Sequence, residues 1–305
     1  MTTLVEKERR CMCSFAQEGP YWHIFTPGKD TPLIFCGKDD YVFAMNAVAQ
    51  AAFAFKDVKI VAFEIMSNHF HALVSGERES VEEFFGYLRK RLAKGIAKDG
   101  HAPLPQSFLL KIKDVTDLAA MRNTIVYINR NGYVADHDYT PFSYPWGTNR
   151  YYFCDFPVVR TYRGTTTVER RCMFRGRIPF LPDSWPVIDG YVAPDAYCHI
   201  GFGMAMFRDA HHYFAAVSKN VEAYREIAGE LDDGEFLTDA ELFAKLVSLV
   251  RDTYHVNGVR DLSKAQKHDL ARTLRYSFRS SNGQIRRLLG LTGYEVDSMF
   301  PLSSE

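Results

Sequence analysis

The sequence predicts an α+β fold, in which an antiparallel sheet has helices on one face and is followed by a helical C-terminal region. In the first 150 of the 305 residues, short runs of β-branched and aromatic residues alternate with segments whose apolar residues recur at helical spacing. From about residue 238 onward, only helical spacing is found. Two of the short runs are separated by just two turn residues, which predicts a hairpin and therefore an antiparallel sheet.

The first strand and helix lie near the N-terminus. Residues 21–25 (YWHIF) have the composition of a strand and are followed by proline and glycine, which are typical of turns. Asp39 or Asp40 can cap a helix that runs to about Phe55. Residues 58–66 (VKIVAFEIM) then form a second strand, because β-branched and aromatic residues fill a short length.

A hairpin and a second helix follow. Residues 67–68 (SN) make a tight turn, and residues 69–74 (HFHALV) form the strand that pairs back on the preceding one. Ser80 is predicted to cap the next helix, because Glu83 stands three residues later as in a capping box. The apolar positions of this helix keep helical spacing to Ile96.

A fourth strand is predicted at residues 108–115 (FLLKIKDV), and a further helix at residues 117–131. The order is therefore β-α-β-β-α-β-α. This is the split β-α-β arrangement of ferredoxin-like folds, an antiparallel sheet with helices on one face.

The remainder of the chain divides into two parts. Residues 151–237 are rich in Pro, Gly and Tyr, and include a basic stretch, residues 160–177, that holds six Arg and one Glu. Residues 238–305 are helical, with four helices predicted at residues 238–255, 263–278, 281–289 and 292–300. We therefore predict a first domain at residues 1–150, a connecting region at 151–237 and a helical region at 238–305.

Composition excludes several classes of protein. Hydrophobic residues make up 47% and charged residues 24%, as in globular proteins and unlike disordered or fibrous ones. No apolar stretch is long enough to cross a bilayer, and the start MTTLVEKERR lacks the apolar core of a secretory signal. The six cysteines form no CxxC pair, which favours free thiols in a reducing compartment. These features predict a cytoplasmic protein with no membrane partner.

His69 and His71 are the most informative pair in the sequence. Side chains two residues apart on a strand point to the same face, so the two imidazoles are expected to lie side by side. Two neighbouring imidazoles can bind a divalent metal ion, although a bare pair of this kind is more often part of an ordinary sheet.

The residues around this pair resemble a known signature. Met66-Ser-Asn-His-Phe-His71 is similar to the HUH motif of single-tyrosine transposases, and most of all to that of the REP-associated tyrosine transposases. In that group the turn usually contains a proline where Ser67 stands here. The substitution loosens the turn slightly but leaves the two histidines in place.

Two later segments carry the same resemblance. Ile125-Val-Tyr-Ile-Asn-Arg-Asn-Gly132 lies at the end of a predicted helix, as the Tyr-Ile-x-x-Asn-Pro segment of the family does, and Ser143-Tyr-Pro-Trp-Gly147 resembles its Tyr-Pro-Trp-Ser segment. Tyr127 and Asn131 are one helical turn apart and share a face. Gly132 stands where the family usually has proline, so we expect Gly132 to end the helix through a left-handed cap.

The resemblance implies a specific chemistry. It makes Tyr127 the nucleophile and His69, His71 and Asn131 the ligands of a divalent metal, Mg²⁺ or Mn²⁺. Such an enzyme nicks and rejoins single-stranded or hairpin DNA through a 5′-phosphotyrosine intermediate and needs no ATP. Because a DNA strand must reach the phenol, the site is expected on an open face of the sheet. Glu64, two residues before Met66, could reach the metal or act as a general base, and a solvated or salt-bridged glutamate is the alternative.

Local basic clusters are candidate DNA-binding surfaces, although Lys plus Arg equals Asp plus Glu at 37 each. One cluster follows the HUH strand and the other lies in the C-terminal region, where residues 280–297 have the pattern of a helix-turn-helix. The alternative is a solvated helix face for the first cluster and a small helical bundle that binds nothing for the second. The candidates are Arg89, Lys90, Arg91, Lys94, Arg272, Arg275, Arg279, Arg286 and Arg287.

Two other functions remain open at this point. One is a replication-initiator or relaxase-type HUH nickase, which would share the chemistry. The other is a domesticated DNA-binding protein that keeps the fold without turnover. The sequence leaves undecided whether the protein is a monomer or a homodimer.

Overall fold

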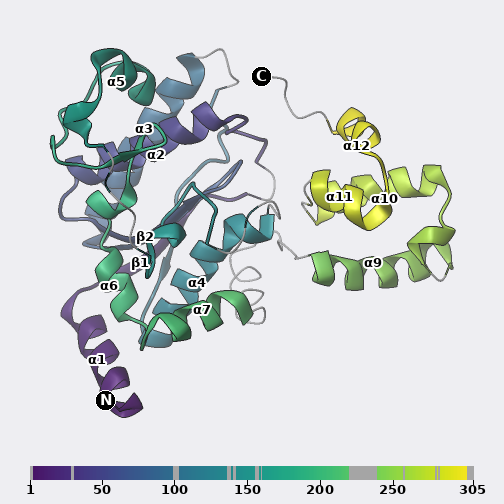
Figure 1. The fold of residues 1–305 in the computed structure, drawn as a ribbon, viewed down its shortest axis with the longest axis horizontal. Helices are drawn as coiled ribbons and strands as arrows, with labels where there is room; N and C mark the ends of the chain where they lie inside the picture. The colour runs from purple at the N-terminus through teal and green to yellow at the C-terminus, as the bar shows by residue number, and fades with distance from the viewer. Residues whose placement is uncertain are drawn as a thin grey trace.

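The computed structural model describes most of the chain (Figure 1). The described residues are 3–28, 31–98, 103–135, 139, 142–154, 158, 160–219, 239–256, 258–278, 280 and 282–300. Within them the fold is α+β, as the sequence predicts. No helix among these residues is long and apolar enough to span a membrane.

A four-stranded antiparallel sheet forms the centre of the larger part of the molecule. Its strands run in the order β2-β3-β1-β4, and every neighbouring pair is antiparallel. The strands are β1 (Tyr21–Phe25), β2 (Lys59–Ile65), β3 (Phe70–Ser75) and β4 (Lys111–Asp114). Three of them lie within the predicted segments, and β3 extends one residue beyond its segment, to Ser75. The predicted hairpin of β2 and β3 is confirmed.

Helices cover both faces of this sheet. Helices α2 (Lys38–Ala54) and α3 (Arg78–Lys98) pack together on one face, and α4 (Leu118–Ala135) lies on the other (Figure 1). The prediction of helices on one face is therefore wrong for α4. The physical reason is that all six residues of β3 are buried, so both faces of the sheet need a cover.

The helix starts differ slightly from prediction. Gly37 is the N-cap of α2, and Asp40 at the third helical position accepts hydrogen bonds from the N–H groups of Cys36 (2.9 Å) and Gly37 (3.2 Å). The Asp40 side chain therefore caps the helix start, but from a position inside the first turn and not from the N-cap position. Helix α3 begins at Arg78, so the cap predicted at Ser80 is wrong.

The N-terminus and the connecting region contain elements that the sequence analysis did not predict. A capping box between Thr3 and Glu6 starts α1 (Leu4–Gln17). The other helices and strands of the larger part are α5 (Thr167–Phe174), β5 (Val187–Ile188), β6 (Tyr191–Val192), α6 (Ile200–Ala205) and α7 (Ala210–Lys219). Short 3₁₀ helices lie at Asn149–Tyr151, Tyr162–Gly164 and Pro194–Ala196.

The C-terminal helices form a group with its own apolar core (Figure 1). They are α9 (Asp239–Tyr254), α10 (Lys264–Ser277), α11 (Asn282–Leu289) and α12 (Gly293–Met299), with a 3₁₀ turn at Val259–Asp261. The four predicted helices are thus confirmed. Gly290 ends α11 with a φ of 64°, a conformation that glycine adopts without strain.

Candidate functional site

Three aromatic side chains meet between β3 and α4. The ring centres of His69 and His71 are 4.9 Å apart, and those of His71 and Tyr127 are 5.3 Å apart. His69 directly precedes β3, whereas His71 lies inside it. The structure therefore brings together the two histidines and the tyrosine that the sequence analysis selected.

Asn68 determines which nitrogen of His69 carries the proton. The Asn68 side-chain amide donates to the carbonyls of Gly28 (2.9 Å) and Thr31 (2.6 Å), which fixes its orientation. Its oxygen then lies 2.7 Å from Nδ1 of His69 and can only accept. Nδ1 of His69 therefore carries a proton, and in the neutral ring Nε2 then has the lone pair that a metal ion requires.

His23 is a third histidine of this cluster, and the sequence analysis did not select it. Its Nε2 lies 3.2 Å from Nδ1 of His71, and its ring centre is 5.8 Å from that of Tyr127. His23 lies on β1, which pairs with β3. The contact depends on the pairing of two strands that are far apart in the sequence, so local spacing could not reveal it.

Glu64 faces the cluster from β2, opposite His71 in the strand register. Its side chain is buried at 1% exposure, and no side-chain cation forms an ion pair with it among the described residues. Burial raises the pKa of Glu64 well above its ordinary value, and the N–H of Gly132 opposes this only in part. The carboxyl group is therefore held close to the histidines in a form that binds its proton tightly.

Helix α4 carries both Tyr127 and Asn131 and continues beyond them to Ala135. The prediction that Gly132 ends the helix is therefore wrong. Gly132 instead allows close packing, because a Cβ atom there would lie 2.2 Å from the Tyr144 ring and 2.6 Å from Oε1 of Glu64. Its role is to let α4 approach the sheet and the following segment.

That segment, residues 143–147, runs along the free edge of β2. The N–H of Ile65 donates to the Trp146 carbonyl (2.8 Å), the Tyr144 hydroxyl donates to the Ile65 carbonyl (2.8 Å), and Gly147 bridges to Glu64. The third motif of the sequence analysis is thereby placed against the strand that carries Glu64, where it closes one side of the site.

The predicted nucleophile and the three predicted metal ligands are buried. His69, His71 and Asn131 have 0% exposure and Tyr127 has 1%, so the expectation of an open sheet face is wrong for this structure. Helix α4 covers the histidines, and its own Tyr127 points into the same buried contact. Within the described residues, no group of three or more His, Cys, Asp or Glu side chains is arranged to hold a metal ion. The predicted ligand set is of another kind, two histidines and an amide.

The basic residues of α3 differ in their surroundings. Arg89 donates to the carbonyl of Phe108 (2.8 Å) and Arg91 to that of Phe174 (2.9 Å), so both connect α3 to neighbouring segments. Lys90 and Lys94 are exposed and available to a ligand.

The basic residues of the C-terminal group also separate into two kinds. Arg272, Arg286 and Arg287 are exposed on the surface. Arg275 is half-buried, donates to the Ser280 carbonyl (3.2 Å), and has its pKa lowered by burial. Arg279 lies outside the described residues.

Comparison with known proteins gives little. No protein-family model matches the chain, and no curated protein matches it. One solved structure, a REP-associated tyrosine transposase bound to a REP hairpin, is similar over 56% of this chain and 94% of its own, with 10% identity and a TM-score of 0.35. A score this low assigns neither fold nor function.

Proposed function

We propose that this protein is a metal-dependent DNA transposase that nicks and rejoins single-stranded or hairpin DNA. Tyr127 is the nucleophile, and a divalent ion, Mg²⁺ or Mn²⁺, is held by His69, His71 and Asn131. We interpret the β-α-β-β-α-β order, with its strand order β2-β3-β1-β4, as a ferredoxin-like HUH core.

The observation that carries this proposal is the meeting of the two histidines and the tyrosine under α4, with Asn68 fixing His69. The orientation of Asn68 leaves Nε2 of His69 with its lone pair, so a neutral imidazole is prepared for a metal ion. Glu64 is buried with no side-chain cation as partner among the described residues, and a metal ion bound beside it would favour its ionised form and so oppose the rise in pKa that burial causes. The residues present are thus suited to bind a divalent metal.

The chemistry assigned to the chain is a transesterification. The Tyr127 oxygen forms a bond to a backbone phosphorus, the bond from that phosphorus to the 3′ oxygen breaks, and the strand leaves with a free 3′-hydroxyl. A bound divalent ion would supply Lewis-acid stabilisation of the charge on the phosphate. His23, in contact with both His71 and Tyr127, holds the two rings in position.

The burial of the site adds a requirement. A phosphate cannot reach a tyrosine that is 1% exposed, so α4 or the segment at residues 143–147 has to move when the strand binds. Gly132 of α4 packs closely against Tyr144 of that segment and against Glu64. Because the two segments meet at this contact, we expect them to separate there.

The test is incubation with a panel of hairpin-flanked single-stranded oligonucleotides and Mn²⁺, followed by a denaturing gel. We expect a covalent protein–DNA adduct that Tyr127→Phe abolishes and Tyr144→Phe retains. An adduct that survives in Tyr127→Phe would assign the nucleophile elsewhere. The absence of any adduct across the panel would contradict the proposal.

Complete burial of the site favours a second candidate, a DNA-binding protein without turnover. Such a protein would bind the same hairpins, give no adduct with any metal, and lose no affinity in Tyr127→Phe. The same gel, together with a binding measurement, separates the two.

A further inference from the structure

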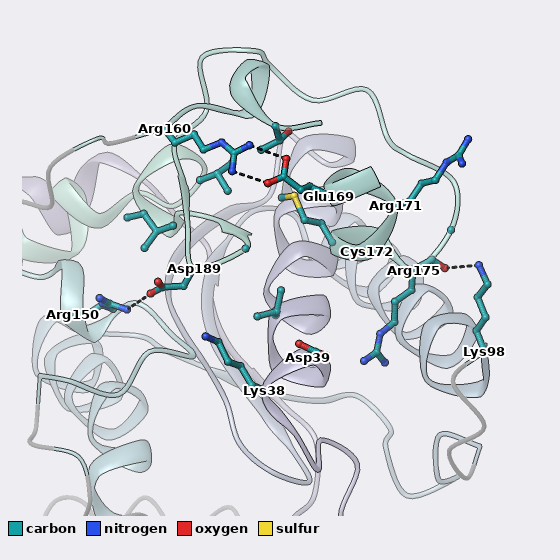
Figure 2. Close-up of a pocket in the computed structure, with 17 residues that line it drawn as sticks. Lys38, Asp39, Lys98, Arg150, Arg160, Glu169, Arg171, Cys172, Arg175 and Asp189 are labelled. Carbon is teal, nitrogen blue, oxygen red and sulfur yellow. Dashed lines mark hydrogen bonds and ion pairs between the residues drawn. The ribbon is translucent and has the colours of Figure 1, made fainter. Parts of the chain in front are cut away.

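A large cavity opens between α2, α5 and the β5–β6 hairpin (Figure 2). Its volume is about 1420 Å³, well above the roughly 300–1,000 Å³ of a small-molecule site. It takes part of its wall from residues 160–177, the basic stretch that the candidate site leaves unused. The size suits an extended ligand rather than a small metabolite.

The lining is strongly basic. Six cationic side chains and three acidic ones border the cavity. Arg160 is neutralised by two hydrogen bonds to Glu169 (2.7 and 2.8 Å), and Arg150 lies 3.9 Å from Asp189 (Figure 2). Arg175 pairs with the buried Asp40 (2.8 Å). These pairs hold the wall together.

Two further cations have no such partner. Lys38 at the start of α2 and Arg171 on α5 are exposed, and neither forms a hydrogen bond or ion pair among the described residues. Lys98 is also on the rim, where it donates to the Arg175 carbonyl (3.3 Å). The apolar side chains of the lining include Val42, Met173, Val187 and Ile188. A lining that combines exposed cations with apolar side chains suits a ligand with several phosphates and less polar groups between them.

Two chain connections place one end of this cavity beside the catalytic residues. The N–H of Phe35 donates to the carbonyl of Ser67 (2.9 Å), in the turn just before His69, and Lys38 follows three residues later. On the other side, Gly147 bridges to Glu64, and Arg150 follows three residues later. Three residues span at most about 10 Å, so Lys38 and Arg150 each lie within that reach of a residue that contacts a segment bordering the site.

The geometry points to a binding groove for the phosphate backbone of a single DNA strand, in which Lys38 contacts a phosphate close to the one that Tyr127 attacks and Arg171, on α5, contacts a phosphate farther along the strand. The inference rests on the proposed function, because it names the path of the same strand. It differs from that function because binding of the strand in the groove requires neither the metal ion nor the cleavage reaction.

The experiment measures the affinity of a fluorescent single-stranded oligonucleotide for the full chain in EDTA, by anisotropy over a range of salt. The variant is Lys38→Glu/Arg171→Glu. The control is Lys56→Glu, an exposed lysine just beyond the other end of α2, about 27 Å along the helix from Lys38.

We expect the double variant to bind roughly tenfold more weakly or worse near 0.1 M salt, with a salt slope lower by about 1.4, since each single-strand phosphate contact contributes about 0.7. Lys56→Glu should match the unaltered chain, and all three should share one melting temperature. Equal losses in the double variant and the control would overturn the inference, as would failure of the unaltered chain to bind single strands.

The two proposals fail separately. A charge-dependent loss of binding in EDTA, together with no adduct under Mn²⁺, would retain the groove and reject the chemistry. An adduct formed equally well by the double variant and the unaltered chain, with equal affinity, would retain the chemistry and reject the groove.

Discussion

The sheet-containing part and the C-terminal helical group differ in what they bury. Among the described residues before residue 220, six His, Asp, Glu or Arg side chains are buried: His23, Asp40, Glu64, His69, His71 and Arg130. In the described C-terminal group, Ser280 and Gln284 are the buried polar residues and none is ionisable. Its core is otherwise aliphatic and aromatic.

The difference indicates where chemistry is located. Burying an ionisable group is unfavourable unless it is paired or does something when a ligand binds. Asp40 is paired with Arg175, but Glu64 has no cationic partner among the described residues. The sheet-containing part therefore holds a buried cluster of the kind that is common at functional sites, whereas the C-terminal group fully buries no charged side chain among its described residues.

The largest expected effect is on metal binding. His69→Ala or His71→Ala should abolish Mn²⁺ binding while the chain stays folded, because each removes one imidazole from the proposed ligand set. Calorimetric titration measures this, with His211→Ala, an exposed histidine on α7, as the control. Unchanged affinity in both variants would show that the cluster is not a metal site. The buried ionisable residues would then no longer distinguish the sheet-containing part from the C-terminal group in function.

The second effect is on stability. Asp40→Asn should destabilise the sheet-containing part by about 3 kcal/mol, because it leaves the Arg175 guanidinium, 9% exposed, without its partner. Denaturant unfolding measures this, with the exposed neighbour Asp39→Asn as the control. The C-terminal pair of Lys264 and Glu295 is more exposed, so Glu295→Gln should change the unfolding midpoint far less.

The same carboxylate predicts a pH dependence. Burial acts to raise the pKa of Asp40, but the Arg175 guanidinium and two backbone N–H groups outweigh it, so the pKa lies below the ordinary value of 3.8. The stabilisation is therefore full above pH 3.8 and is lost as the pH falls through the lowered pKa. An acid titration of Asp40→Asn and of the unaltered chain tests this. If both lose the same amount of stability as the pH falls, the loss belongs to other groups.

The third effect compares two glycines within helices. Gly132→Ala should destabilise the chain by about 2 kcal/mol despite the better helix propensity of alanine, because the new Cβ would overlap the Tyr144 ring. Gly86→Ala in α3 has nothing within 4 Å and should stabilise by about 0.5–1 kcal/mol. Thermal melts decide this, and two changes of the same sign would contradict the packing of α4 seen here.

The smallest effect concerns the C-terminal group. Deleting residues 238–305 should leave metal binding in place and weaken DNA binding by roughly an order of magnitude, through loss of phosphate contacts from Arg272, Arg286 and Arg287. Because the two cores share no residue, the truncated protein should remain soluble. An insoluble product would mean that the group supports the sheet, and full affinity would mean that it does not contact DNA.

The sequence by itself determined the strands, most of the helices and the pairing of His69 with His71, because these depend on spacing along one element. It also determined that Tyr127 and Asn131 share a face of α4, since they are one turn apart. The capping box of Thr3 and Glu6 was visible as well and would have predicted α1.

Only the tertiary structure decided how these elements meet. His23 joins the cluster because β1 pairs with β3, Gly132 packs against Tyr144 instead of ending its helix, and α4 covers the face of the sheet that was expected to be open. The basic cavity likewise joins α2 to residues about 130 positions later. Contacts between residues far apart in the chain depend on which surfaces pack together. The spacing of residues along one helix or strand does not determine that packing.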